Sequence, residues 1–71
     1  MNYKGPGIST YWGDDKFADR KAIVMKNNEG FYVEFYKNEE VVERRTVYEH
    51  SENYAEDTAE NFVMGIINPW M

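Results

Sequence analysis

Apolar residues in the last third of the chain recur with the spacing of a helix. Between residues 51 and 67 they follow at steps of three and four, which places them on one side of a helix with about 3.6 residues per turn. They are Tyr54, Ala55, Ala59, Phe62, Val63, Ile66 and Ile67. Ser51 can accept a hydrogen bond from the first turn, and Asn68-Pro69 disfavours continuation. The pattern predicts an amphipathic helix over 51–67, in which Gly65 marks either close packing or fraying after Met64.

The middle of the chain has the composition and punctuation of short strands. Strands are predicted over 21–26, 31–37 and 41–48, separated by turn residues. In the second of them, alternate residues fall on opposite faces. One face carries Phe31, Val33 and Phe35, and the other carries Tyr32, Glu34 and Tyr36. We expect the phenylalanine face to pack against the helix.

The third strand is charged at its centre, where Glu43, Arg44 and Arg45 follow one another. Such a strand belongs at the edge of a sheet, because charge there discourages pairing with other chains. Its register with the second strand has two solutions. A two-residue turn sets Glu34 opposite Glu43, whereas a three-residue turn sets Glu34 opposite Arg44.

These elements predict one α+β domain over 21–71, preceded by an N-terminal arm over 1–20. The domain is a three-stranded antiparallel β-meander with one C-terminal α-helix packed on one face. Residues 8–12 of the arm are β-branched and aromatic, so the arm could add a short strand. The face away from the helix would display Tyr32 and Tyr36, and either the arm or a second copy of the chain would cover it.

Composition narrows the function classes. The 71 residues carry a net charge of −5, which argues against binding to a phosphate backbone and permits a basic partner. The absence of cysteine excludes thiolate chemistry and disulfides, and is compatible with the cytoplasm. There is no run of 18 apolar residues that would predict a membrane span, and no secretory signal pattern.

Residues that could support catalysis or metal binding are better explained as solvated surface groups. His50 lies between Glu49 and Ser51, but neighbours along a chain cannot usually point at one another as a triad requires. Asp14, Asp15 and Asp19 lack the spacing of a calcium loop. We therefore expect no enzyme activity, no cofactor and no metal.

From residue 21 to 67, the order of strand, Asn/Gly turn, strand, turn, charged strand and capped helix with Ala59-Glu60-Asn61-Phe62 resembles two groups of domains. One is the arm-binding domain of tyrosine recombinases, and the other is a class of small domains with a Tyr-(x)-Ala-Glu helix after a hairpin. The first resemblance implies DNA reading by a basic sheet face. Here Glu34, Glu39, Glu40 and Glu43 stand where lysine and arginine would be needed. The composition, which is rich in Asn, Tyr, Glu and Asp and poor in Pro, is similar to that of small proteins of large tailed phages, including those of cyanobacteria.

The high share of aromatic residues, 17%, suggests that some of them serve a partner. The candidate interaction residues are Tyr11, Trp12, Tyr32, Tyr36, Arg44, Arg45 and Trp70. We expect a small acidic, non-catalytic protein-protein interaction module, encoded by a phage, that acts on a host or phage protein in the host cytoplasm and can form a homodimer. The alternatives are a nucleic-acid-binding sheet domain and a DNA mimic that presents carboxylates to a basic protein.

Overall fold

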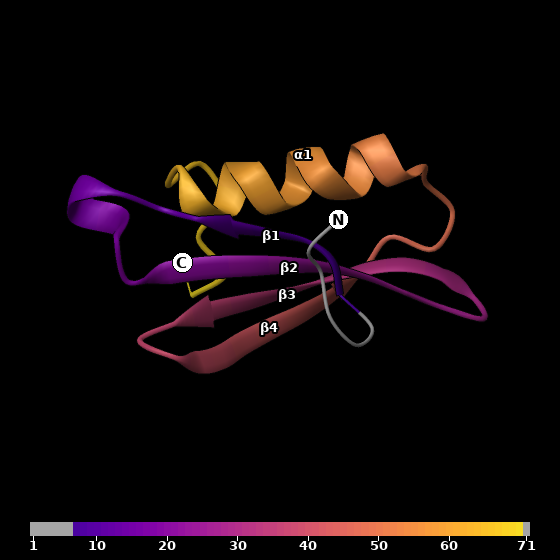
Figure 1. Cartoon of the computed structure of the whole chain (residues 1–71), viewed down its shortest axis with the longest axis horizontal. Coiled ribbons are helices and arrows are strands. Elements are labelled where there is room, and N and C mark those ends of the chain that lie inside the picture. Colours follow the sequence, from indigo (N-terminus) through magenta and orange to yellow (C-terminus); the bar gives the residue numbers. More distant parts are fainter. Residues whose placement is uncertain (1–6, 71) are drawn as a thin grey trace.

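The computed structural model describes residues 7–70, which form a sheet with one helix across it (Figure 1). The strands are β1 (Gly7–Trp12), β2 (Arg20–Asn27), β3 (Gly30–Lys37) and β4 (Glu40–Thr46), and the helix is α1 (Glu52–Val63). The antiparallel sheet has the order β1-β2-β3-β4, so each strand lies beside its neighbour in sequence. A short 3₁₀ helix (Asp15–Phe17) connects β1 to β2. The chain is therefore of the α+β class, as predicted.

The prediction of three strands was wrong by one, because the segment predicted as an optional short strand is a full member of the sheet. β1 pairs with β2 from Ser9↔Val24 to Trp12↔Lys21. This part of the predicted arm extends the sheet sideways rather than crossing over its face. Residues 1–6 of the predicted arm lie outside the described residues.

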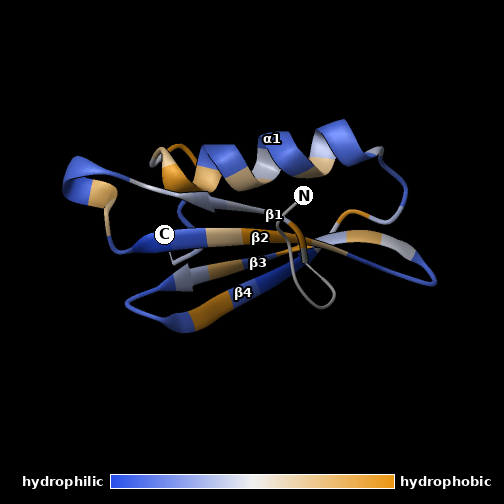
Figure 2. Ribbon diagram, viewed as in Figure 1, coloured by the Kyte–Doolittle hydropathy of each residue, from blue (hydrophilic) through white to orange (hydrophobic). Residues whose placement is uncertain are grey.

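The core lies between α1 and the sheet. Ala22 and Val24 of β2 and Val33 and Phe35 of β3 are fully buried there, and the ring of Phe35 stacks on that of Phe62 with 4.3 Å between centroids. Figure 2 shows the same division along α1, with hydrophobic positions toward the sheet and hydrophilic ones outward. The prediction that the phenylalanine face of β3 meets the helix is confirmed.

A β-bulge decides the register between β3 and β4. The hairpin has a two-residue turn, Asn38-Glu39, with Lys37 opposite Glu40. Val42 then forms an extra residue, and beyond it Glu34 lies opposite Arg44. Each predicted register was therefore correct in part. The two-residue turn is present, and the favourable pairing of Glu34 with Arg44 is also present, because the bulge shifts the pairing of the two strands by one residue.

The helix ends at Val63, four residues earlier than predicted. Gly65 has φ +86°, its N–H donates to the carbonyl of Phe62, and the N–H of Ile66 donates to the carbonyl of Asn61. This is the hydrogen-bond pattern of a Schellman motif, in which glycine takes the left-handed position. Ile66 consequently leaves the apolar stripe and is 63% exposed, contrary to prediction.

Tyr54 also departs from the predicted apolar stripe. It lies in the first turn of α1, is half-exposed, and stacks on the ring of His50 with 3.7 Å between centroids. The N-cap prediction is confirmed, since Ser51 accepts a hydrogen bond from the N–H of Tyr54.

Arg20 joins the end of the helix to the sheet, and the sequence pattern did not reveal this role. The residue is 6% exposed, and its guanidinium donates to the carbonyls of Phe62 and Ile67 and to the side chain of Asn68. It also lies 4.7 Å from the ring of Trp70. The segment after α1 is therefore held beside the first residue of β2.

Candidate interaction surface on the open side of the sheet

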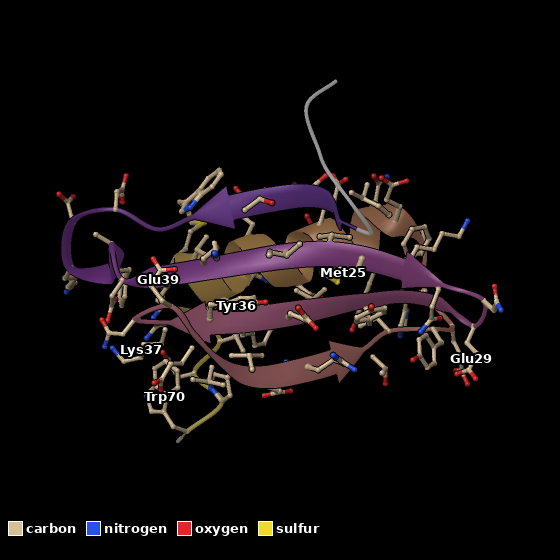
Figure 3. The ribbon with its side chains drawn as sticks, turned by 60° about the horizontal axis from the view of Figure 1, so that its bottom comes forward. Met25, Glu29, Tyr36, Lys37, Glu39 and Trp70 are labelled. Carbon is tan, nitrogen blue, oxygen red and sulfur yellow. The ribbon has the colours of Figure 1, made fainter. Side chains whose placement is uncertain are left out.

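The face of the sheet away from α1, called here the open face, is identified by the strand registers. Residues directly opposite one another in an antiparallel pair project from the same side. The open face carries Thr10 and Trp12 of β1; Lys21, Ile23 and Met25 of β2; Tyr32, Glu34 and Tyr36 of β3; and Val41, Arg44 and Thr46 of β4. Within residues 7–70, no helix or strand lies over it (Figures 1 and 3).

The registers arrange these side chains in three rows across the strands. The first row is Trp12, Lys21, Tyr36 and Val41. The second row is Thr10, Ile23, Glu34 and Arg44, and the third is Met25, Tyr32 and Thr46. Trp12 is 68% exposed and Val41 is 55% exposed, while the side chains between them are half-buried by one another. The first row is thus an apolar strip with one cation in it.

An ion pair neutralises the middle of the open face. Glu34 is only 7% exposed and accepts hydrogen bonds from the Arg44 guanidinium at 3.1 and 2.8 Å and from the Tyr36 hydroxyl at 3.0 Å. The hydrogen bond to Glu34 raises the pKa of Arg44. Burial, and then the hydrogen bond to Glu34, raise the pKa of Tyr36. The Glu34 charge is therefore paired, while the Arg44 side chain, 63% exposed, remains on the surface of the open face among its aromatic and aliphatic groups.

Cations of this face lie over aromatic rings rather than standing free. The Lys21 ammonium is 4.7 Å from the centre of the Tyr36 ring, and the Arg44 guanidinium is 5.4 Å from that of Tyr32. Lys21 also approaches the Glu39 carboxylate at 3.9 Å. Each such cation–π pair stabilises the fold by about 0.5–1 kcal/mol at exposed sites.

Four of the seven predicted interaction residues meet on the open face: Trp12, Tyr32, Tyr36 and Arg44. The other three do not. Tyr11 packs against the core on the helix side, where burial and the nearby Glu56 carboxylate raise its pKa. Arg45 also lies on the helix side, paired with Glu43 at 2.8 Å.

Trp70 is the third predicted interaction residue away from the open face. Its ring meets that of Phe62 edge-on at 6.1 Å between centroids, and Figure 3 shows it with Lys37 at one end of the sheet. Its ring contacts the core residue Phe62 but remains 48% exposed. The sequence-based site list missed Val41, whose position opposite Tyr36 becomes apparent only when the two-residue turn and the bulge are known.

The residues considered for chemistry are dispersed. A cavity of about 440 Å³ lies between the β1–β2 connection and the end of α1, and Asp14, Asp15 and Glu60 line it together with Trp12. Asp19 instead pairs with Lys37. Across residues 7–70, no three His, Cys, Asp or Glu side chains gather in a way that could hold a metal ion.

Comparison of the chain with protein-family models, with curated proteins and with solved structures finds no match. The resemblances to recombinase arm-binding domains and to phage proteins therefore stay predictions. In the part of the chain that the structure describes, no helix is both long and apolar enough to cross a membrane.

Proposed function

We propose that this protein is a non-catalytic protein-interaction module that binds its partner through the open face. The observation that carries the proposal is the exposed apolar strip from Trp12 to Val41, over which nothing in residues 7–70 packs. Contiguous exposed apolar surface rimmed by polar groups marks interaction sites in small proteins. Tryptophan, tyrosine and arginine are also the residues that most often dominate binding energy.

The charge distribution favours a protein as the partner. Carboxylates gather on the outer side of α1, where Glu52, Asp57 and Glu60 are exposed, whereas the central carboxylate of the open face is already paired. The binding surface therefore presents rings and aliphatic groups without a strong field of either sign. A role as a phage-encoded factor acting on a host or phage protein belongs to this proposal and rests on composition alone.

A second candidate function is binding of single-stranded nucleic acid on the same face. Lys21 over Tyr36 and Arg44 over Tyr32 supply aromatic platforms with cations beside them, the combination on which unpaired bases stack. The net charge of −5 opposes it. A gel shift with oligonucleotides at low salt, where such binding is strongest, distinguishes this candidate from the first.

The experiment that tests the proposed function compares captured proteins between two variants. Trp12→Ser removes the exposed ring from the open face, and Tyr54→Ser removes a half-exposed ring from the helix side as the matched control. Immobilised wild-type protein and both variants are exposed to the same lysate, after circular dichroism has verified folding. We expect a specific partner to be lost with Trp12→Ser and kept with Tyr54→Ser. Equal capture by all three proteins, together with unchanged self-association of Trp12→Ser, would show that the open face is not the binding surface.

A further inference from the structure

We propose that the occupant of the open face is a second copy of this chain. The two sheets would pack face to face about a two-fold axis that lies between them and runs parallel to the strands. Because it names the partner of the same surface, this dimer rests on the proposed function. The strand registers, the pairing of charges and the available area each support it.

The registers make the open face complementary to itself. Rotation about such an axis preserves strand direction and reverses strand order, so β1 faces β4 of the second copy and β2 faces β3. Each row of side chains then meets the same row reversed. In the first row, Trp12 meets Val41 of the second copy, so the largest side chain opposes a small one. Lys21 meets Tyr36 of the second copy, so a cation opposes an aromatic ring.

The other rows fit in the same way. In the third row, Met25 meets Tyr32 of the second copy, a sulfur–aromatic contact. In the second row, Ile23 meets the Glu34 of the second copy, whose carboxylate is already bonded to its own Arg44. A buried charge without a partner strongly destabilises an interface, and the carboxylate at the centre of this one is paired.

The acidic charge of the chain does not oppose this packing. The exposed carboxylates of α1 lie on the far side of each sheet, so in the dimer they form the two outer surfaces. Three layer spacings of roughly 10 Å each would separate them. This exceeds the Debye length of about 8 Å at physiological ionic strength, so their mutual repulsion is largely screened.

The area of the open face determines how strongly the two copies are expected to bind. The two central strands have eight residues each, which at roughly 3.4 Å per residue gives a length of about 27 Å. Four strands at roughly 4.8 Å spacing give a width of about 19 Å. The flat area is then roughly 500 Å² per copy, or about 1,000 Å² for both, which lies at the lower limit for specific interfaces. We therefore expect a reversible dimer with a dissociation constant on the order of 1–100 µM.

Sedimentation equilibrium from about 1 µM to 1 mM tests the dimer directly, since this range brackets the expected constant. Met25→Glu places an unpaired carboxylate inside the interface, and we expect it to weaken the dimer about 100-fold or more. Tyr54→Glu is the matched control, because Tyr54 is half-exposed in the first turn of α1, on the helix side of the sheet. A monomer at every concentration, or a dimer that tolerates Met25→Glu, would overturn the proposal.

Cross-linking tests the direction of the axis. The chain contains no cysteine, so single Trp12→Cys and Val41→Cys variants each carry one reactive thiol. A bis-maleimide that spans the roughly 10 Å between packed sheets should join the two variants to each other when they are mixed. Self-linking of either variant alone should be much weaker. The opposite preference would refute this axis.

The dimer and the proposed function can fail separately. A protein that stays monomeric, but loses a specific partner with Trp12→Ser, retains the proposed function and refutes the second copy as occupant. A monomer that binds a single-stranded oligonucleotide through Trp12 refutes both, in favour of the nucleic-acid candidate. A dimer broken by Met25→Glu and joined by the Trp12–Val41 cross-link supports both.

Discussion

Replacement of Arg20 by methionine should strongly destabilise the fold, because this guanidinium holds the end of α1 to the sheet. It donates to the carbonyl of Phe62 at 2.8 Å, to that of Ile67 at 3.2 Å, and to the Asn68 side-chain oxygen at 2.6 Å. It also stacks against the ring of Phe17 at 4.6 Å. Within residues 7–70, no carboxylate forms a salt bridge with it. Carbonyls at the helix end, where the dipole is negative, stabilise the charge instead.

The size of the expected loss in stability follows from the interactions that methionine cannot make. Methionine keeps most of the apolar volume but removes the buried hydrogen bond from the guanidinium to the carbonyl of Phe62, which still accepts from the N–H of Gly65. Loss of such a bond from a charged donor costs about 1.5–3 kcal/mol. The bonds to Ile67 and Asn68 are only partly buried, so water can substitute for them at roughly 0.5 kcal/mol each. Relief from burying a charge offsets part of this loss. We expect a net loss of about 2–3 kcal/mol, from a total stability of roughly 4–11 kcal/mol for a chain of this length.

Urea unfolding monitored by tryptophan fluorescence measures this loss. The protein should be kept at or below about 1 µM, because association of the folded state adds apparent stability. Arg20→Lys keeps the charge without the planar fork and should lose about half as much. Lys16→Met is the control, since it removes an exposed cation near the same Phe17 ring and should change stability by less than about 0.5 kcal/mol. An Arg20→Met protein within about 0.5 kcal/mol of wild type would refute the role assigned to this guanidinium.

Three further perturbations test the local structure. Glu39 has φ +69° in the second hairpin turn, so Glu39→Gly should stabilise the protein by about 0.5–1 kcal/mol in urea unfolding. Gly65→Ala should destabilise it by about 2 kcal/mol or more, because a Cβ there would lie 2.2 Å from the Phe17 ring at a left-handed position. The hydrogen bond from Lys37 lowers the pKa of Asp19 below 3.8 in the folded state. The ionised Asp19 carboxylate thus stabilises the fold above pH 3.8, and this contribution is lost as pH falls through the lowered pKa. In Asp19→Asn, the free energy of unfolding should therefore fall less steeply as the solution is acidified.

Each of these has a matched comparison. Glu40→Gly, one position into β4, should destabilise, since strand glycine loses entropy without relieving strain. Met64→Ala, beside the capping glycine but exposed, should be nearly neutral. Asp15→Asn should leave the acid decline unchanged, because no salt bridge to Asp15 exists among the described residues. A loss of stability in Glu39→Gly, a neutral Gly65→Ala, or an identical acid profile in Asp19→Asn would contradict the corresponding explanation.

The sequence by itself determined the elements whose cause is local. The three- and four-residue spacing from Ala55 to Val63 specifies a helix face, and Ser51 specifies its start, because both effects act within a few residues. Alternation around Phe35 likewise specifies which face of β3 is buried. These signals were sufficient for the α+β class and for the presence of Tyr32 and Tyr36 on one side of the sheet.

Only the tertiary structure decided features that depend on residues far apart in the chain. The buried role of Arg20 requires the end of α1, more than forty positions later, to arrive beside β2. The bulge at Val42 allows a two-residue turn and the pairing of Glu34 with Arg44 in the same hairpin, and neither preference alone predicts this register. The row that places Trp12 in line with Val41 exists only because β1 joins the sheet at the edge opposite β4. Local patterns encode which face of an element is apolar, whereas the composition of a surface across four strands depends on their relative registers.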